Sequence, residues 1–443
     1  MIISKVAKGK GKNYIEYKNK PYLLYGVQIR MDEAAEISKN YNDLEMNFLK
    51  ASEIGFRSVM LPLRWREFER EDGVFDYEML DNYFLWANKY NLTIHLLWFG
   101  SNVCGKQKSI PAFILEDAVT YKRFENSDFI DLSNDVLLER EKAALIRVMQ
   151  RIFEKDTEQR TAILQIENEP DYASGWQNQY REALRYIDEL GKLVKNSDYS
   201  VVTRVNITAA DTLKTNHVPE DILALEGIDA VGTDIYFNDI NFHNEWIKKL
   251  STGEMIDNIV HISEGGGQIQ KLLKIIANSF SLGCGYLVYE LRTVRKNDYD
   301  FGVLRCSTEN WEYRDGTKLV QHQWTADDFI PENNTGNIIK FNEAVNSLSE
   351  VIATSSIGDI VVLEPNEEYI TENGKIEFKT EETDSDSFGL LLKLSQDTFS
   401  FFTLAKKSEL HYNAGSIYVG DQRKDVNGFL SLEQGVVYKI NNY

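Results

Sequence analysis

The chain has 443 residues and a formal net charge of −20, from 49 Lys and Arg against 69 Asp and Glu. Because this charge repels phosphate backbones and anionic bilayers, we expect neither a nucleic acid nor a membrane as a partner. The hydrophobic content of 43% is typical of a soluble protein, and the length allows a large catalytic domain with a smaller appended one.

The amino terminus and the cysteines bear on cellular location. The first residues, MIISKVAKGKGKNY, lack the apolar stretch of about 7 to 15 residues that a secretory signal requires. No run of about 18 apolar residues follows, so we expect a cytoplasmic protein. The three cysteines, Cys104, Cys284 and Cys306, are widely spaced without a C-x-x-C pair, which favours reduced structural thiols.

Eight short apolar runs recur along the chain, and each is typical of a buried parallel strand. They occupy residues 22–29, 58–63, 93–99, 162–167, 200–207, 228–237, 258–263 and 285–290. Stretches of helical period lie between them, for example residues 42–55 and 139–155. This alternation predicts an α/β protein with a (β/α)8 barrel. The longest gap, residues 100–135, predicts an extended loop at the catalytic mouth.

The sequence changes character near residue 358. A helical stretch at 337–355 comes first, and short apolar runs then alternate with turn residues such as Glu372-Asn373-Gly374. This pattern predicts a small antiparallel β-sandwich. We therefore divide the chain into a (β/α)8 catalytic domain at residues 1–355 and a β-sandwich domain at residues 356–443.

Two glutamates follow strand ends, where a barrel of this kind presents its reactive side chains. Glu169 follows the fourth predicted strand in LQIENEP, and Glu264 follows the seventh in ISEGGG. Three strand positions separate them around the ring, which places their carboxylates on facing sides of a narrow pocket. A retaining glycosidase needs one protonated and one ionised carboxyl about 5 to 5.5 Å apart. Like charges this close raise one pKa, which would keep the acid protonated near neutral pH.

A glutamate at a strand end is more often a solvated loop residue, and 69 acidic residues make coincidence easy. The neighbouring residues favour the catalytic interpretation. Asn168 can hold a sugar hydroxyl, and three glycines after Glu264 let the backbone approach a ligand closely. The other carboxylates to consider are Asp171 and Glu167, which strand alternation directs to the same side as Glu169.

Further motifs occur in a fixed order along the chain. They are GFRSV at 55–59, W-x-x-x-E-x-x-x-G-x-F-D-Y at 65–77, LLWFG at 96–100, IPAF at 110–113 and QIENE at 165–169. Because these motifs occur together and in this order, residues 20–350 resemble the enzymes of glycoside hydrolase clan A, and within it the family 35 β-galactosidases. The β domain is similar to one appended in a bacterial subgroup of that family. The resemblance implies a retaining, exo-acting enzyme that releases terminal β-galactosyl residues from oligosaccharides by double displacement.

The resemblance also implies roles for individual residues. Glu169 would be the general acid/base and Glu264 the nucleophile. Asn168 would contact the hydroxyl next to the anomeric carbon, and Tyr236 would hydrogen-bond the nucleophile. The chain departs from the family pattern at Arg57, where Asn is usual, and this departure leaves the identity of the sugar open.

Other strand ends supply candidate substrate-binding residues. These are Gln28, Trp65, Trp98, Glu167 and Tyr289. An aromatic ring at such a position can stack on a pyranose, although core packing is an equally good interpretation of each aromatic. Arg30 can bind a hydroxyl or pair with a carboxylate.

No cofactor and no metal are implied. The six histidines show no H-E-x-x-H arrangement, and Gly265-Gly266-Gly267 matches no phosphate-loop frame. The expected partner is an oligosaccharide or glycoside, and a homo-oligomer stays possible. Two rival interpretations remain: a β-glucosidase, β-mannosidase or endo-acting enzyme of the same clan, and a sugar-binding barrel that has lost turnover.

Overall fold

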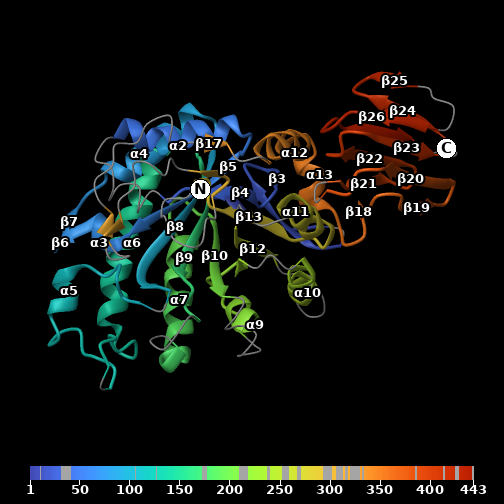
Figure 1. The fold of residues 1–443 in the computed structure, drawn as a ribbon. Helices are drawn as coiled ribbons and strands as arrows, with labels where there is room; N and C mark the ends of the chain where they lie inside the picture. Colours follow the sequence, from blue (N-terminus) through green and yellow to red (C-terminus); the bar gives the residue numbers. More distant parts are fainter. Residues whose placement is uncertain are drawn as a thin grey trace.

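Eight parallel strands form a closed barrel, as predicted (Figure 1). Going round the barrel, their order is β10-β11-β12-β13-β4-β5-β8-β9. Their bounds are β4 (Tyr25–Gln28), β5 (Ser58–Arg64), β8 (Thr93–Val103), β9 (Thr161–Asn168), β10 (Val202–Thr208), β11 (Ala230–Ile235), β12 (Ile259–Gly266) and β13 (Gly285–Tyr289). Every residue of β5, β9 and β10 is buried, which explains their continuous apolar runs.

This architecture is seen in a computed structural model of the chain. The residues it describes are 1–9, 11–30, 41–104, 106–125, 127–171, 177–208, 218–236, 240–251, 259–266, 271–292, 302–305, 313–314, 318–319, 330–331, 334–384, 387–412, 415–424 and 429–441. Of the cysteines, Cys104 and Cys284 carry reduced thiols, and Cys306 lies outside these residues.

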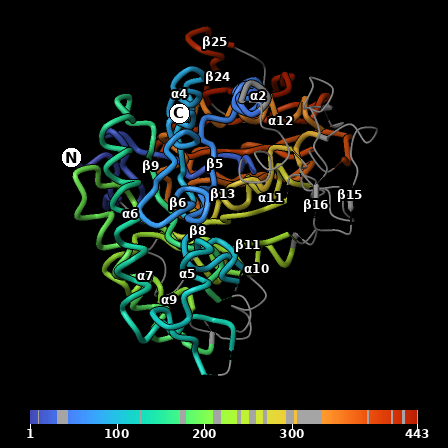
Figure 2. Tube along the Cα trace, turned by 90° about the vertical axis from the view of Figure 1, so that its left-hand side faces the viewer, coloured from blue at the N-terminus to red at the C-terminus, as the bar shows by residue number. Residues whose placement is uncertain are grey.

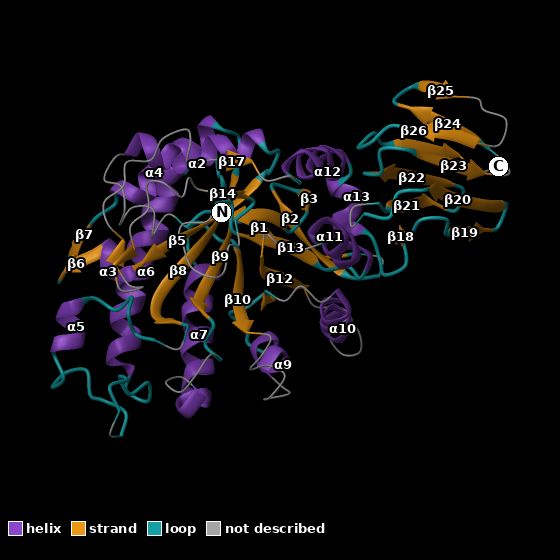
Figure 3. Ribbon diagram, viewed as in Figure 1, coloured by secondary structure: helices purple, strands orange, loops and turns teal. Residues whose placement is uncertain are grey.

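Helices surround the strands (Figure 3). The longer ones are α2 (Tyr41–Glu53), α4 (Glu78–Lys89), α6 (Asp135–Lys155), α7 (Tyr180–Lys195), α10 (Ile240–Ser251), α11 (Leu272–Ser281) and α12 (Thr335–Ser347). The shorter ones are α3 (Trp65–Phe68), α5 (Ala112–Glu116), α9 (Val218–Leu223) and α13 (Ser349–Thr354). No helix among the described residues combines the length and the apolar character needed to cross a bilayer.

Helices α6 and α7 pack side by side, and α7 packs against β9 and β10, which carry part of the candidate site (Figure 2). The amide of Asn134 caps α6 and accepts a hydrogen bond from the Val136 N–H at 3.1 Å. The predicted loop before α6 contains α5, while its first residues, up to Val103, continue β8 instead.

A three-stranded antiparallel sheet precedes the barrel and was not predicted. It consists of β1 (Ser4–Lys8), β2 (Asn13–Tyr17) and β3 (Lys20–Tyr22). Ile15 of β2 packs with Ile163, Val202 and Ile259, which lie near the amino ends of three barrel strands. This sheet therefore covers the end of the barrel opposite the strand-end carboxylates.

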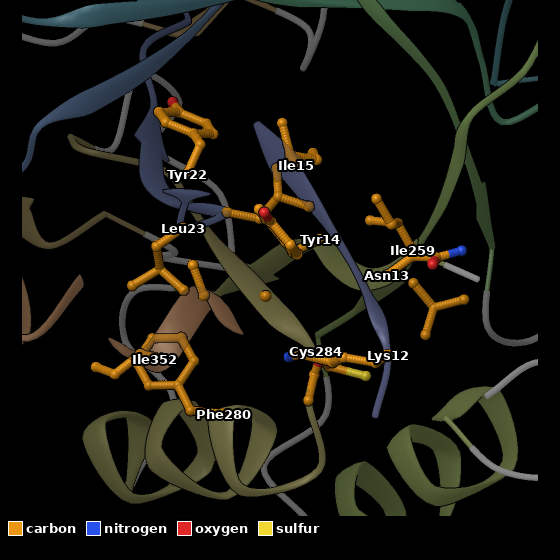
Figure 4. A pocket seen from close by; sticks show the side chains of 15 residues that line it. Lys12, Asn13, Tyr14, Ile15, Tyr22, Leu23, Ile259, Phe280, Cys284 and Ile352 are labelled. Carbon is orange, nitrogen blue, oxygen red and sulfur yellow. Dashed lines mark hydrogen bonds between the residues drawn. The ribbon is translucent and has the colours of Figure 1, made fainter. Parts of the chain in front are cut away.

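A small cavity lies beside this sheet (Figure 4). Lys12, Tyr14, Leu23, Phe280 and Cys284 are among its lining residues, and its volume is about 30 Å³. That is about the volume that one water molecule occupies in the liquid. This cavity is too small for a sugar.

The carboxyl-terminal region forms two antiparallel sheets, as predicted. The six-stranded sheet has the order β18-β21-β22-β27-β24-β25 and the four-stranded sheet β19-β20-β23-β26. Their bounds are β18 (Ile360–Leu363), β19 (Glu368–Thr371), β20 (Gly374–Thr380), β21 (Gly389–Ser395), β22 (Thr398–Thr403), β23 (Ser408–Tyr412), β24 (Ser416–Val419), β25 (Gln422–Lys424), β26 (Phe429–Leu432) and β27 (Tyr438–Asn441). Short ribbons elsewhere are β6 (Glu69–Glu71), β7 (Val74–Phe75), β14 (Leu304–Arg305), β15 (Tyr313–Arg314), β16 (Lys318–Leu319) and β17 (Ile330–Pro331).

One hydrophobic core continues from the barrel into these sheets. The ring of Phe341 on α12 lies 6.5 Å from that of Phe388 and 5.9 Å from that of Phe402, between ring centroids. Leu390 and Leu392 of β21 belong to the same buried cluster as the barrel strands. The sheets thus stabilise the barrel through α12.

Candidate active site

Polar side chains occupy the middle of the barrel. Arg204 on β10 is fully buried and lies 2.9 Å from His261 Nε2 and 3.6 Å from the Met60 sulfur. Burial lowers the pKa of Arg204 to about 10, while the carboxylates of Asp234 and Glu264 oppose that shift. Because this pKa is still well above 7, Arg204 places a positive charge below the strand-end carboxylates.

A bulge in β12 directs Glu264 into the barrel. In the pairing of β11 with β12, Thr233 lies opposite Ile262 but Asp234 lies opposite Glu264, so Ser263 is skipped. Such a bulge lets two consecutive side chains face the same side. The Ser263 hydroxyl donates to Asp234 at 2.6 Å, and the Glu264 carboxylate faces the same interior.

The carboxylate of Glu264 accepts a hydrogen bond from the hydroxyl of Tyr236, the contact that the resemblance implied. Burial, and then the charge of Glu169, raise the pKa of Glu264 to about 7. Tyr236, Arg30 and Arg204 oppose this shift because each stabilises the ionised form. A raised pKa at the predicted nucleophile was not expected from the sequence.

Glu169 stands just beyond the end of β9 in an unusual backbone conformation. Its φ is 47° and that of Glu167 is 59°, both in the left-handed region that non-glycine residues rarely occupy. The Glu169 N–H donates to Asn206 Oδ1 at 3.2 Å. The Glu169 side chain, which is partly exposed, also interacts with the thiol of Cys104. Strain of this kind concentrates at functional sites.

An amide network joins the ends of β9, β10 and β11. Asn206 Nδ2 donates to Asn168 Oδ1 at 3.0 Å and to Asp234 Oδ2 at 2.9 Å. Gln165 Nε2 donates to Asn206 Oδ1 at 2.9 Å. Asn168 Nδ2 donates to the Cys104 sulfur at 3.3 Å, so one further N–H of this amide can serve a ligand.

Tyr289 and Gln28 extend the site towards β13 and β4. The rings of Tyr289 and Tyr236 meet edge to face, with centroids 5.4 Å apart. Arg30 donates to the Tyr289 hydroxyl. Gln28 is 1% exposed, and its Oε1 accepts no hydrogen bond within the described part of the chain. A role of Gln28 and Tyr289 in sugar binding stays a prediction.

Glu167 is not in this group, which corrects its assignment as a substrate-binding residue. It is fully buried, and its carboxylate accepts the N–H groups of Ser101 at 2.9 Å and Asn102 at 2.7 Å. It also hydrogen-bonds the carboxyl of Glu141 on α6. Strand alternation failed here because the positive φ of Glu167 turns its side chain away from the position that alternation predicts.

The prediction of Trp65 and Trp98 as substrate-binding residues was also wrong. Both are fully buried, and their indole N–H groups donate to Glu69 at 2.9 Å and to Glu141 at 2.8 Å. Both belong to the main apolar core. Neither ring is open to a sugar, so core packing is the correct interpretation.

The glycines after Glu264 also have a packing role. A Cβ at Gly265 would overlap the hydroxyl of Tyr286 on the next strand. Glycine is therefore needed for strand packing, rather than only for approach of a ligand as predicted. Gly267 lies outside the described residues.

Sequence reasoning missed three residues of the site: Asn206, Asp234 and Cys104. Asn206 and Asp234 lie near the ends of the fifth and sixth strands, so the rule that found the two glutamates would have found them too. Asp171 is bound to Thr208, whose N–H and hydroxyl both donate to it at about 3 Å. Among the described residues, no group of three or more His, Cys, Asp and Glu is arranged to hold a metal ion.

Comparison with known proteins places this geometry in context. A family model described as "Domain of unknown function (DUF4978)" matches residues 183–331. No curated protein sequence matches the chain. Among solved structures, it is similar to a family 39 glycoside hydrolase from Bacteroides cellulosilyticus WH2, with a TM-score of 0.50, 13% identity, and coverage of 98% of this chain and 85% of that one.

Two further structures are similar over about three quarters of the chain. The exo-β-1,4-mannosidase from Opitutaceae bacterium strain TAV5 has a TM-score of 0.54 and 12% identity, over 76% of this chain and 62% of that one. The β-galactosidase from Rahnella sp. R3 has a TM-score of 0.54 and 11% identity, over 78% and 58%. The chain thus spans less than two thirds of these two proteins. At such low identity the likeness establishes the shared fold.

Proposed function

We propose that the chain is a retaining glycoside hydrolase with Glu264 as nucleophile and Glu169 as general acid/base. The observation that carries the proposal is the hydrogen bond from Tyr236 to Glu264 at the mouth of the barrel, where the charge of Glu169 also acts on Glu264. A retaining mechanism needs two such carboxyls, one ionised and one protonated. The fold shared with several glycoside hydrolases supports the same class of reaction.

The groups around Glu264 favour the required distribution of charge. Arg30, Arg204 and the Tyr236 hydroxyl all stabilise its ionised form. On this ground we assign the ionised role to Glu264 and the role of proton donor to Glu169. Glu264 then attacks the anomeric carbon while Glu169 protonates the leaving oxygen. In the second step, Glu169 takes a proton from water, which displaces the sugar from Glu264.

The proposed substrate is a terminal β-galactoside, cleaved from the non-reducing end of an oligosaccharide. The order of motifs that resembles family 35 supports this choice, and the long segment between β8 and α6 lies where it could close one end of the cleft. Asn168, Gln28 and Tyr289 are the proposed contacts to the sugar. A closed cleft favours removal of one sugar at a time.

The test is a comparison of kcat/KM for p-nitrophenyl β-galactoside, β-glucoside and β-mannoside. We expect the galactoside to be preferred, because a buried polar pocket can reject an epimer by factors on the order of 10⁴. A preference for either of the other sugars would reject the galactosidase assignment and keep the reaction class. Binding of all three without release would support a sugar-binding barrel instead.

A further inference from the structure

Asp234 is a third carboxylate between the two catalytic candidates. It lies on β11 opposite Glu264 and is 5% exposed. Its oxygens accept hydrogen bonds from Ser263 Oγ at 2.6 Å and Asn206 Nδ2 at 2.9 Å. Its carboxyl also faces the carboxyl of Glu169. Two carboxyl groups that meet can form a hydrogen bond only when one of them carries a proton.

Asp234 therefore contacts Glu169 by two routes. The direct route is the approach of the two carboxyl groups to each other. The indirect route runs through Asn206, whose Nδ2 donates to Asp234 and whose Oδ1 accepts the N–H of Glu169 at 3.2 Å. Asp234 thus constrains both the main chain and the side chain of the residue proposed as the acid/base.

The charged groups that face Asp234 come from several strands. The carboxylates are Glu264 on β12 and Glu169 after β9, and the cation is Arg204 on β10. The hydroxyl of Tyr236 lies against Glu264. Burial, and then the charges of Glu264 and Glu169, raise the pKa of Asp234 well above its usual range, and the bond from Ser263 opposes the rise.

We propose that Asp234 is a positioning residue that shares one proton with Glu169 and holds the acid/base carboxyl in place. This inference rests on the proposed function and adds a third carboxylate to it. The shared proton is the one that Glu169 delivers to the leaving oxygen and recovers from water. Asp234 itself need not touch the substrate.

The first test uses Asp234→Asn, which keeps the shape of the side chain and a group that can bond Asn206 or Ser263. The matched control is Asp229→Asn, just before the amino end of β11, where the carboxylate pairs with Lys195 at 2.7 Å. In Asp234→Asn we expect kcat/KM for a methyl glycoside to fall about 10-fold or more, with a smaller loss for a dinitrophenyl glycoside. Acid assistance matters little for a good leaving group.

The pH profile separates this role from a structural one. Removal of a neighbouring negative charge makes the acid lose its proton more easily, so the basic limb of kcat/KM should move to lower pH in Asp234→Asn and stay in place in Asp229→Asn. The proposal would be overturned if the basic limb of kcat/KM stayed in place in Asp234→Asn and kcat/KM fell equally for both leaving groups.

A second measurement does not depend on activity. In protein labelled with ¹³C at the aspartate carboxyls, the signal of Asp234 can be assigned by its absence in Asp234→Asn. We expect its titration midpoint to move to lower pH in Glu169→Gln, because that change removes a negative neighbour. An unchanged midpoint would refute proton sharing. If the wild type hydrolyses no glycoside, the proposed function fails, and this titration still decides the role of Asp234.

Discussion

Two groups of carboxylates lie near the end of β9, all of them buried except the partly exposed Glu169, and the groups differ in what surrounds them. Glu169, Asp234 and Glu264 form the site group, at the mouth of the barrel. Glu141 and Glu167 form the sealed pair, which lies between the barrel and helices α6 and α7. Burial is the main cause of the raised pKa values of Glu264 and Glu167. A raised pKa of a carboxyl group is therefore insufficient evidence that the group is catalytic.

The difference lies in the partners. In the sealed pair, fixed groups of the protein occupy the carboxylate oxygens: the main-chain N–H groups of Ser101 and Asn102 bind Glu167, and Trp98 and Tyr186 bind Glu141. In the site group, Glu169 is partly exposed and can meet a ligand. We expect that access of a ligand to its carboxylates distinguishes the site group from the sealed pair.

Replacement of the proposed nucleophile should have the largest effect. We expect Glu264→Ala to lower kcat by at least about 10⁴-fold for every glycoside, because no covalent intermediate can form. Azide should partly restore turnover and give a product of inverted anomeric configuration, detectable by NMR. Hydrolysis at the wild-type rate would remove Glu264 from the mechanism.

Replacement of the proposed acid should have an effect that depends on the leaving group. For Glu169→Ala we expect a loss of about 10² to 10⁴-fold in kcat/KM on alkyl glycosides and a much smaller one on dinitrophenyl glycosides. Azide should here give a product of retained configuration. An equal loss across a series of leaving groups would contradict the acid role.

The sealed pair should affect stability rather than turnover. The raised pKa of Glu167 means that the folded state holds its proton, so this residue stabilises the fold fully below the unfolded value of 4.5 and loses that contribution as the pH rises towards the folded value. In Glu141→Gln, an amide can donate to Glu167, so the decline of the unfolding free energy over the pH range above 4.5 should flatten.

Urea unfolding across that pH range measures this effect, and kcat/KM should stay within about twofold of the wild-type value. A loss of turnover as large as that of Glu264→Ala would break the distinction between the two groups. If the unfolding free energy of the wild type does not change with pH over this range, Glu167 is ionised in the folded protein.

The smallest effect on turnover is expected in the carboxyl-terminal sheets. Phe402→Ala should lower the unfolding free energy by about 3 to 5 kcal/mol, because its buried ring packs on Phe341 of α12. Phe429→Ala is the matched control, since that ring is 45% exposed and should cost about 0.5 kcal/mol or less. Folded Phe402→Ala that had lost its activity would assign these sheets a part in catalysis.

The barrel was predictable because its strands are buried on both faces and therefore appear as continuous apolar runs. The places of Glu169 and Glu264 near strand ends were predictable because both come after apolar runs, and their catalytic roles stay proposals. The amino-terminal sheet was missed because strands such as Asn13–Tyr17 mix polar and apolar residues. Its role in covering the barrel depends on contacts with distant strands, which no local pattern reveals.

Errors within the site arose where backbone irregularities changed the direction of side chains. The positive φ of Glu167 defeats alternation, and the bulge at Ser263 and Glu264 lets both residues face inward. Trp65 and Trp98 satisfied the strand-end rule, yet both indole N–H groups donate to buried carboxylates, Trp65 to Glu69 four residues on and Trp98 to Glu141 on α6. Such pairings require the folded structure.

The most direct test of the account is covalent trapping of the intermediate. The enzyme would be incubated with 2-deoxy-2-fluoro β-galactosyl, β-glucosyl and β-mannosyl fluorides, which slow the second step more than the first, and then digested for peptide mass mapping. We predict that one fluorosugar inactivates the enzyme and adds its glycosyl mass to the peptide containing Glu264, with no such adduct in Glu264→Ala. An active enzyme labelled at another carboxylate, or one that inverts its substrate without any adduct, would contradict the assignment.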